Sequence, residues 1–257
     1  YVFNAWFSLP DTLTSRAGEQ NNAFIGFTDF VLRFLRQEQP CHVVFAFDES
    51  LQYSERNEIF ADYKANRAPA PEALKRQFRW CRQWIEALGI SQVASDRHEA
   101  DDLIGTLVEH GRRQGRPSTI VSRDKDLTQL LGKDDVFWDF AGKGKLRYDE
   151  IVHSFGVWPE QIADFLALAG DSVDNVPGAP GIGPKTAVKL LQEFGNLEEI
   201  LDRAPELTAK RARESLIENA ELVRLATLPF LFRRLVDPIK NLTFQFQVSL
   251  DVLVSRF

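Results

Sequence analysis

Apolar residues recur at helix spacing in three long stretches of the chain. Within residues 20–38, the recurrence of Phe24, Phe27 and Val31, continued by Phe34 and Leu35, predicts an amphipathic helix. Residues 72–88 and 99–114 show the same kind of pattern and are predicted to be long helices. These helices alternate with shorter apolar segments.

Those shorter segments predict strands. The run from Cys41 to Phe47 is apolar and partly β-branched, as in a strand that is buried on both faces. Residues 92–94, 118–122 and 136–139 are further candidates. Alternation of strands and helices is typical of an α/β fold, so we expect a central, mostly parallel sheet flanked by helices.

The pattern changes near residue 157, where it becomes helical except for a Gly- and Pro-rich loop at 175–184. We therefore expect an α/β domain at residues 1–156 and a helical lobe at 157–257. Cys41 and Cys81 have no metal-ligand neighbours in the sequence and are interpreted as buried or incidental thiols.

Composition is that of an ordinary globular protein, with 257 residues, 44% hydrophobic and 26% charged. No stretch approaches the roughly 18 consecutive apolar residues of a membrane span, so we expect a cytoplasmic protein without a membrane partner. The net charge of −6 disfavours binding to nucleic acid at first sight. If eight clustered acids are set aside, however, 29 of the 37 acidic residues face 31 basic ones, and DNA is not excluded.

The eight acids follow predicted strands or helix ends in four groups. In open parallel sheets, ligands bind beyond the carboxyl ends of the strands, and acids occur there repeatedly. They are Asp48; Glu99, Asp101 and Asp102; Asp124 and Asp126; and Asp171 and Asp174.

Each acidic group also has a simpler interpretation, because acids favour turns and helix N-termini as capping residues. Four groups brought together would repel one another without a counter-charge. Mg²⁺ or Mn²⁺ suits an all-oxygen ligand set, and paired cations about 4 Å apart hydrolyse phosphodiester bonds. No Ser-His-Asp or Cys-His arrangement competes, and the four histidines are interpreted as surface or structural residues.

Several strings together resemble the 5′ nuclease family, which includes the 5′-3′ exonuclease domain of bacterial DNA polymerase I and the flap endonucleases. The resemblance extends from about Tyr1 to at least residue 230. The strings are Phe47-Asp48, Glu99-Ala100-Asp101-Asp102, Asp124-Lys125-Asp126-Leu127, residues 170–178 around Asp171 and Asp174, and residues 181–187.

The resemblance implies a structure-specific 5′ nuclease with a PIN-like domain that uses two or more Mg²⁺ or Mn²⁺ ions. Asp48, Glu99, Asp101 and Asp102 would hold the first metal. The second would be held by Asp124, Asp126, Asp171 and Asp174. The family has a further metal-ligand Asp a few residues before the position of Tyr1, and often an Arg near Asn4.

By the same resemblance, residues 51–84 form a helical arch that passes the 5′ strand. In it, Lys64 and Arg67 would contact the scissile or adjacent phosphate, and Tyr63 would stack on a base. The basic residues of 75–82 are explained equally well by a solvated helix face.

Residues 181–187 resemble a helix-hairpin-helix (H3TH) element, which binds duplex phosphates through exposed amides and can hold K⁺. Its candidate contacts are Gly181, Ile182, Gly183, Lys185 and Thr186. The expected partner is DNA with 5′ flaps or free 5′ ends, bound by a monomer in replication and repair. The alternatives are a DNA-binding protein with impaired catalysis and an RNA-cleaving enzyme on a related scaffold.

Overall fold

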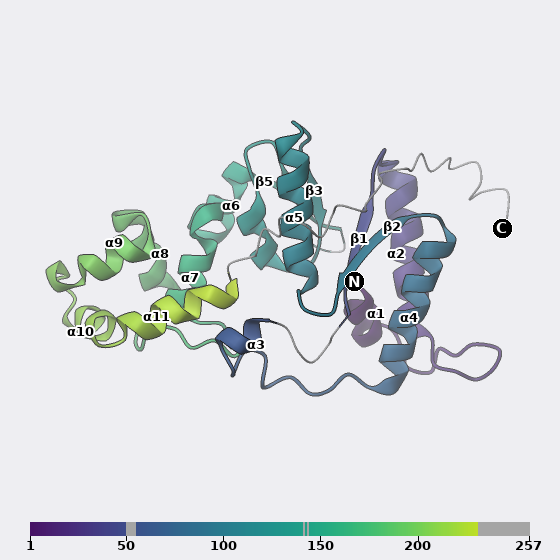
Figure 1. The fold of residues 1–257 in the computed structure, drawn as a ribbon, viewed down its shortest axis with the longest axis horizontal. Coiled ribbons are helices and arrows are strands. Elements are labelled where there is room, and N and C mark those ends of the chain that lie inside the picture. The colour runs from purple at the N-terminus through teal and green to yellow at the C-terminus, as the bar shows by residue number, and fades with distance from the viewer. Residues whose placement is uncertain (50–54, 141, 143, 231–257) are drawn as a thin grey trace. The chain divides into compact units, whose positions relative to one another are not determined.

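The computed structural model describes residues 1–49, 55–140, 142 and 144–230 (Figure 1). These residues form two compact units. The first unit holds 1–49 and 69–100, and the second holds 55–68 and 101–230. The predicted domain boundary after residue 156 stays a prediction. No helix in the described residues combines the length and the apolar character that crossing a membrane requires.

The first unit packs helices against a two-stranded parallel ladder. Its elements are α1 (Val2–Ser8), α2 (Asn22–Glu38), β1 (Val44–Asp48), α4 (Glu72–Ala87) and β2 (Ser91–Ser95). The register pairs Val44 with Ser91 and Asp48 with Ser95. The apolar stripe of α2 buries Phe27, Val31 and Phe34, as its spacing predicts.

Two buried amides join the helices of the first unit. Asn22 donates to the carbonyl oxygens of Trp6 and Leu9, at 2.9 and 3.2 Å. Gln77 on α4 accepts from the amide of Phe24 at 3.0 Å. Both side chains are fully buried, so these hydrogen bonds offset the cost of removing them from water.

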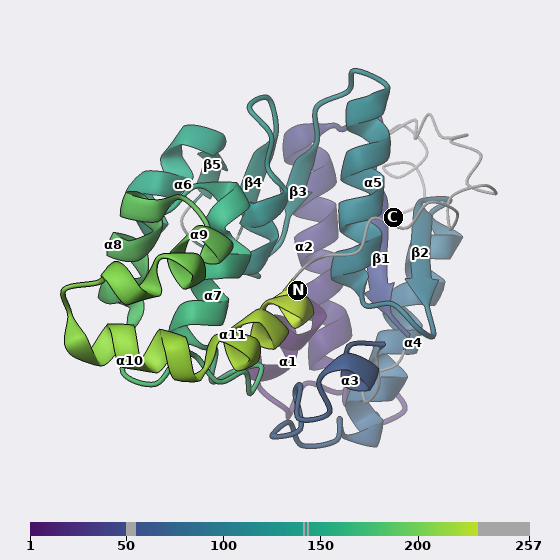
Figure 2. The same cartoon turned by 60° about the vertical axis from the view of Figure 1, so that its left-hand side comes forward.

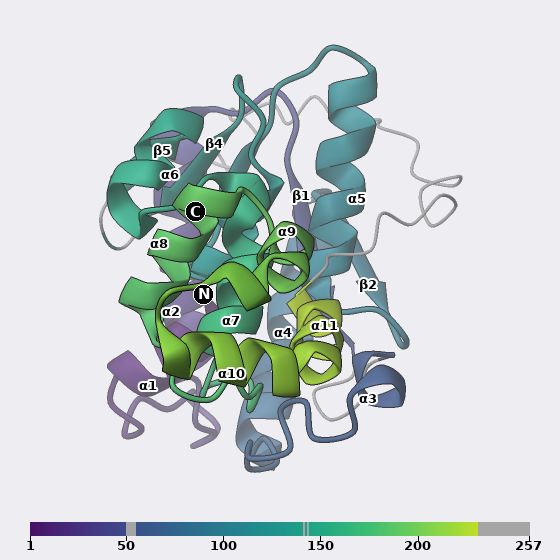
Figure 3. The same cartoon turned by 90° about the vertical axis from the view of Figure 1, so that its left-hand side faces the viewer.

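The second unit contains a small mixed sheet at one end and helices at the other. Figure 2 shows α5 alongside β3, and Figure 3 shows the cluster formed by α8 to α11. Its elements are α3 (Arg56–Ile59), α5 (Ala100–Arg113, whose first residue belongs to the first unit), β3 (Thr119–Val121), η1 (Lys125–Leu130), β4 (Val136–Asp139), β5 (Gly144–Arg147), α6 (Tyr148–Phe155), η2 (Pro159–Gln161), α7 (Ile162–Ala169), α8 (Pro184–Phe194), α9 (Leu197–Asp202), η3 (Ala204–Glu206), α10 (Lys210–Glu218), α11 (Ala220–Thr227) and η4 (Leu228–Phe230).

One continuous core runs through the second unit. Leu168 of α7, Leu191 of α8 and Ile200 of α9 are all at most 1% exposed. Burying each such side chain contributes about 1.5–3 kcal/mol. The helices around residues 160–227 therefore form a firm base for the loops between them.

The α/β class and the helical character after residue 157 are confirmed, with differences in detail. The described strands form two small sheets, β1-β2 and β3-β4-β5, and β5 runs antiparallel to β4. The first strand begins at Val44 rather than Cys41, because the ladder with β2 begins only there. In the predicted arch, residues 50–54 lie outside the described residues, and the stretch from 60 to 71 consists of turns and extended chain.

Candidate functional site

Asp124 and Asp126 lie directly after β3, at the start of η1. Asp124 caps this short helix, since its Oδ1 accepts from the amide of Asp126 at 3.0 Å. The amide of Asp124 in turn donates to Ser122 Oγ at 3.0 Å. This cap fixes the backbone that carries both carboxylates, as a helix N-terminus favours.

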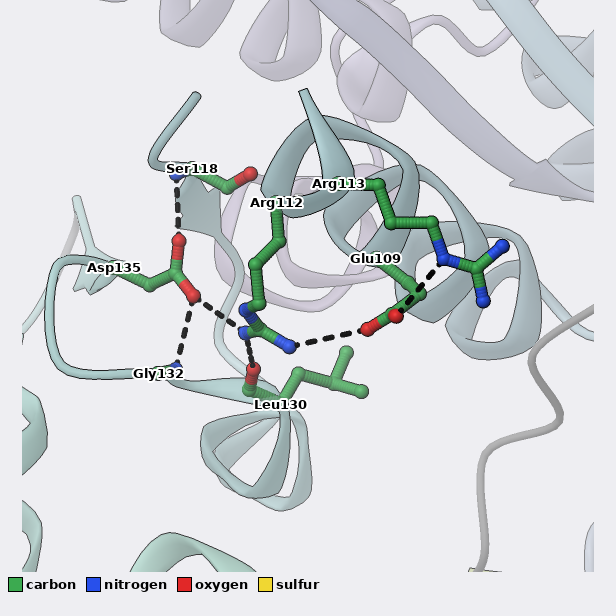
Figure 4. A network of polar contacts seen from close by, with 7 residues as sticks. All are labelled: Glu109, Arg112, Arg113, Ser118, Leu130, Gly132 and Asp135. Carbon is green, nitrogen blue, oxygen red and sulfur yellow. Dashed lines mark hydrogen bonds and ion pairs between the residues drawn. The ribbon is translucent and has the colours of Figure 1, made fainter. Parts of the chain in front are cut away.

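An ion pair between the exposed Arg112 and the buried Asp135 holds η1 in place from the side (Figure 4). The carboxylate of Asp135 accepts from Ser118 N at 2.7 Å, Gly132 N at 2.9 Å and Arg112 at 2.6 Å. Arg112 also donates to the carbonyl oxygen of Leu130, the last residue of η1, at 2.8 Å. The start of β3 and the end of η1 are thereby tied to α5.

Asp171 and Asp174 lie on a tight loop that follows α7. The loop closes through paired hydrogen bonds between Asp171 and Val176, at 2.9 and 2.8 Å. Asp171 Oδ1 accepts from the amide of Val173 at 2.7 Å. At the neck of the loop, a Cβ on Gly178 would lie 2.4 Å from the carbonyl carbon of Ala169, so only glycine fits there.

The charges of three neighbouring carboxylates act on Asp126. The pKa of Asp126 is raised to about 7, first by burial and then by the charges of Asp124, Asp171 and Asp174, while Lys64 opposes the rise. Burial also raises the pKa of Asp124, although the amide of Asp126 lowers it. Asp124 as a residue is exposed, so solvent screens part of this effect, and Asp126, which is half-buried, is the better indicator.

The segment that carries Lys64 and Arg67 lies against this loop. Asp174 accepts from Tyr63 Oη at 3.1 Å and forms an ion pair with Arg67. The amide of Lys64 donates to the carbonyl oxygen of Asp174 at 2.9 Å. Lys64 itself is in the left-handed region, with φ +56°, and its ammonium lies 4.7 Å from the ring of Tyr63.

Two asparagines also join the segment of Lys64 and Arg67 to the loop of Asp171 and Asp174. Neither asparagine was assigned a role from the sequence. Asn66 donates to the carbonyl oxygen of Ser172 at 3.0 Å, and Asn175 donates to that of Asp62 at 2.7 Å. Beside this contact lies an open pocket of about 280 Å³. It is lined by Phe60, Asp62, Asp171, Ser172, Asn175, Val176 and Pro177.

The other four predicted acids are divided between the two units. In the second unit, Asp102 is buried and paired with Arg56, while Asp101 is half-buried beside it. In the first unit, Asp48 accepts from the amide of Ala100 at 2.8 Å, and Glu99 precedes that residue. Among the residues that the structure describes, no three acids, histidines or cysteines are arranged as a preformed set of metal ligands.

The predicted hairpin ends at the N-terminus of α8. Gly181 has φ +78°, Ile182 is buried with its amide on the carbonyl oxygen of Ala179, and Gly183 is the N-cap. Lys185 is exposed, and the amide of Thr186 bonds back to Gly183 at 2.9 Å.

Arg211, on α10, also lies at the hairpin and was missed by sequence reasoning. A Cβ on Gly181 would lie 2.6 Å from its Nε, so the guanidinium packs directly on this glycine. Like Lys185 and Lys189, Arg211 is exposed and makes no ion pair with any described residue. No spacing rule links residues 181 and 211, because only the fold brings them together.

Three of the four basic residues of α4 form ion pairs with acidic residues of the first unit. Lys75 pairs with Glu72, Arg76 with Glu19, and Arg82 with Glu49. These contacts favour the interpretation as a solvated helix face over a dedicated binding surface.

Comparison with known protein families shows to which family the chain belongs. Residues 1–156 match the model described as the 5′-3′ exonuclease N-terminal resolvase-like domain. Residues 157–248 match the one described as the 5′-3′ exonuclease C-terminal SAM fold. The chain belongs to the 5′-3′ exonuclease family.

Relatives in this family include both long and short proteins. DNA polymerase I of Rhizobium leguminosarum is 36% identical over 233 residues, which cover 88% of this chain and 23% of that protein. The 5′-3′ exonuclease of Aquifex aeolicus is 35% identical over 230 residues, covering 88% of this chain and 79% of that protein. The chain thus spans about a quarter of the length of the first of these.

Solved structures share the fold of this 5′-3′ exonuclease family member. T5 5′-exonuclease with bound zinc ions matches with a TM-score of 0.70 and 21% identity, over 80% of each chain. The catalytic core of Rad2 in complex with a DNA substrate matches with a TM-score of 0.59 and 18% identity, over 99% of this chain and 82% of that one. The expected fold is therefore confirmed.

Proposed function

We propose that this protein is a structure-specific 5′ nuclease that hydrolyses DNA at 5′ flaps and free 5′ ends. The observation that carries the proposal is the attachment of the segment with Lys64 and Arg67 to the loop of Asp171 and Asp174. The charges of this loop act on Asp126, whose pKa is raised to about 7 by burial first and then by the neighbouring carboxylates. Cations facing clustered carboxylates suit phosphodiester hydrolysis, because the phosphate and the metal ions need opposite charges side by side. Membership of the family supports the same reaction.

The donor set fits hard divalent cations. Asp124, Asp126, Asp171 and Asp174 repel one another, and an Mg²⁺ or Mn²⁺ ion would remove this repulsion. As a further part of the proposal, Asp48, Glu99 and Asp101 belong to a first metal site. When bound, such ions activate a water molecule and stabilise the departing oxygen.

The protein's own residues would position the substrate. Lys64 and Arg67 provide positive charge for the scissile phosphate, and the bonds from Asn66 and Asn175 keep them beside the carboxylates. Tyr63 is 4% exposed and donates to Asp174, so we assign it to orienting this carboxylate rather than to stacking on a base. This replaces the expectation from the sequence.

The hairpin is proposed to grip the duplex. Gly181, Gly183 and Thr186 shape the start of α8, where free amides favour a phosphate, and the carbonyl groups nearby suit K⁺. Lys185 adds a charge from the exposed face, and Ile182 anchors the turn in the core. Recognition would follow the shape of the duplex rather than its sequence.

Cleavage of a 5′-flap DNA by the wild type with Mg²⁺, and its loss in a variant carrying Asp124→Ala and Asp126→Ala, tests the proposal. If the wild type binds the flap DNA but does not cleave it with any divalent metal, the alternative of a DNA-binding protein is supported instead. A matched RNA flap separates DNA from RNA cleavage. We also propose a monomer that acts in the cytoplasm during replication and repair, and sedimentation analysis tests its oligomeric state.

A further inference from the structure

Arg56 and Asp102 form a buried pair that the proposed reaction leaves unexplained. Arg56 Nη1 donates to Asp102 Oδ2 at 2.8 Å, and Nη2 donates to Oδ1 at 2.7 Å. The two side chains are only 7% and 4% exposed. Such a planar, two-bond geometry is the strongest form that an arginine–carboxylate pair takes.

This pair joins two parts of the second unit that are distant in sequence. Arg56 begins α3 in the segment that also carries Lys64, which we call the strap and define as residues 56–67. Asp102 lies in the first turn of α5, next to Asp101. The far end of the strap is bonded to the loop of Asp171 and Asp174, so the strap is fixed at both ends.

Within the strap, a further bond limits its freedom to bend. Asn57, next to Arg56, donates to the carbonyl oxygen of Tyr63 at 2.8 Å. Tyr63 then donates to Asp174. A continuous series of contacts therefore leads from Asp102, through Arg56 and the strap, to the backbone of Lys64.

The same geometry leaves Asp102 poorly suited to bind a metal ion. Each of its carboxylate oxygens already accepts from the guanidinium, and almost no solvent reaches them. A metal ion that bound to Asp102 would lie next to the buried guanidinium of Arg56, and the two positive charges would repel each other. Asp101 is half-buried and is therefore the more accessible of the two carboxylates.

We propose that Asp102 is not a metal ligand but a positioning residue, which acts through Arg56 to hold the strap and thereby Lys64. The inference deepens the proposed nuclease function and rests on it. It divides the acidic pair at the start of α5 into one residue for the metal, Asp101, and one for the strap, Asp102.

Two kinds of measurement separate the roles. Metal binding is measured by calorimetry, titrating Mn²⁺ into the metal-free protein. Hydrogen exchange of the Lys64 amide, which bonds to Asp174, reports on the strap without any metal. The variants are Asp101→Asn, Asp102→Asn and Arg56→Lys, the last of which keeps the charge but not the two-bond geometry.

We expect Asp101→Asn to weaken Mn²⁺ binding by about tenfold or more, as loss of a ligand does. Asp102→Asn and Arg56→Lys should resemble each other instead, with Mn²⁺ affinity close to the wild type, faster exchange at Lys64 and a lower kcat with little change in KM. The amide of Ile182, bonded to Ala179 in the hairpin, serves as the internal control and should keep its exchange rate.

Asp102→Asn leaves the charge of Arg56 unpaired in the interior, which could unfold the protein. A double variant keeps the test decisive in that case. Arg56→Met with Asp102→Leu replaces the pair by apolar side chains of similar volume, which folded proteins often tolerate. Retained Mn²⁺ affinity in this variant supports the positioning role. Mn²⁺ affinity lowered as far as in Asp101→Asn would overturn it, as would unchanged exchange at Lys64 in Arg56→Lys. If the nuclease proposal itself fails, the wild type neither binds Mn²⁺ nor cuts DNA, whereas the exchange result still reports on the strap.

Discussion

Asp126 should make the metal-free protein less stable as the pH rises. Its pKa in the folded state is raised from 3.8 to about 7, by burial first and then by the neighbouring carboxylates. Below about pH 4 both the folded and the unfolded state hold the proton. Between pH 4 and 7 only the folded state keeps it, so the free energy of unfolding falls as the pH rises. Above pH 7 both states have lost the proton, so the free energy of unfolding no longer changes with the titration of Asp126.

The size of the effect follows from the shift. About three units at 1.36 kcal/mol per unit give an upper limit of about 4 kcal/mol. Asp126 is only half-buried and Asp124 is exposed, so solvent screening reduces the expected loss to about 1–2 kcal/mol. For a chain of this size, that corresponds to about 2–8 °C in Tm.

Urea unfolding of wild type and Asp126→Asn, in EDTA at pH 5 and pH 8, measures this loss. The variant should be more stable than the wild type by about 1–2 kcal/mol at pH 8, and the difference should shrink at pH 5. Saturating Mg²⁺ should stabilise the wild type more than the variant, because binding to the folded state adds to its stability. Asp134→Asn, which removes an exposed carboxylate outside the cluster, is the control. An equal difference between Asp126→Asn and wild type at both pH values would refute the reasoning.

Three further substitutions test other parts of the site. Lys64→Ala should lower kcat on a 5′-flap DNA by about 10²–10³-fold while Mn²⁺ affinity in calorimetry stays unchanged, because the lost charge faces the phosphate. Gly178→Ala should destabilise the protein by more than about 2 kcal/mol in urea unfolding and lower activity, since its Cβ would overlap Ala169. Arg211→Ala should weaken DNA binding and reduce the slope of log K against log salt by about 1, measured by fluorescence anisotropy, because one phosphate contact is lost.

Each of these substitutions has a control within the chain. Lys133→Ala removes an exposed lysine in the turn before β4 and should leave kcat unchanged. Gly183→Ala meets no atom within 4 Å, so it should cost less than about 1 kcal/mol. Arg203→Ala removes an arginine that pairs with Glu206, and it should leave the salt slope as it was. A Gly183→Ala loss as large as that of Gly178→Ala would contradict the steric explanation.

Helices were predictable from the sequence where one face is apolar and the other polar. The expected helix at 72–88 is found at Glu72–Ala87, and that at 99–114 at Ala100–Arg113. The strand β5 was missed because Gly144–Arg147 is short and polar, with Leu146, which pairs with Phe137, as its one large apolar residue. Its place is set by pairing with β4, which no local pattern records.

The acidic groups were visible because they follow strands and helices, but their partners were not. Asp124 and Asp126 could be placed at the end of β3 from the sequence alone. The pairing of Asp102 with Arg56 joins residues 46 positions apart, and periodicity carries no signal over that distance. Sequence reasoning therefore proposed the carboxylates as a group, and the pairing of Asp102 with Arg56 became visible only in the structure.

The loop that carries Asp171 and Asp174 has a consequence for how such a sequence can diverge. Gly170 and Gly178 meet at its neck, where a Cβ on either would lie 2.5 Å or less from the backbone opposite. Because the neck fixes the path of the chain, the tip can vary, and Val173 is 66% exposed there. Substitutions at Val173 can therefore be tolerated while two small, chemically silent residues keep both acids in place.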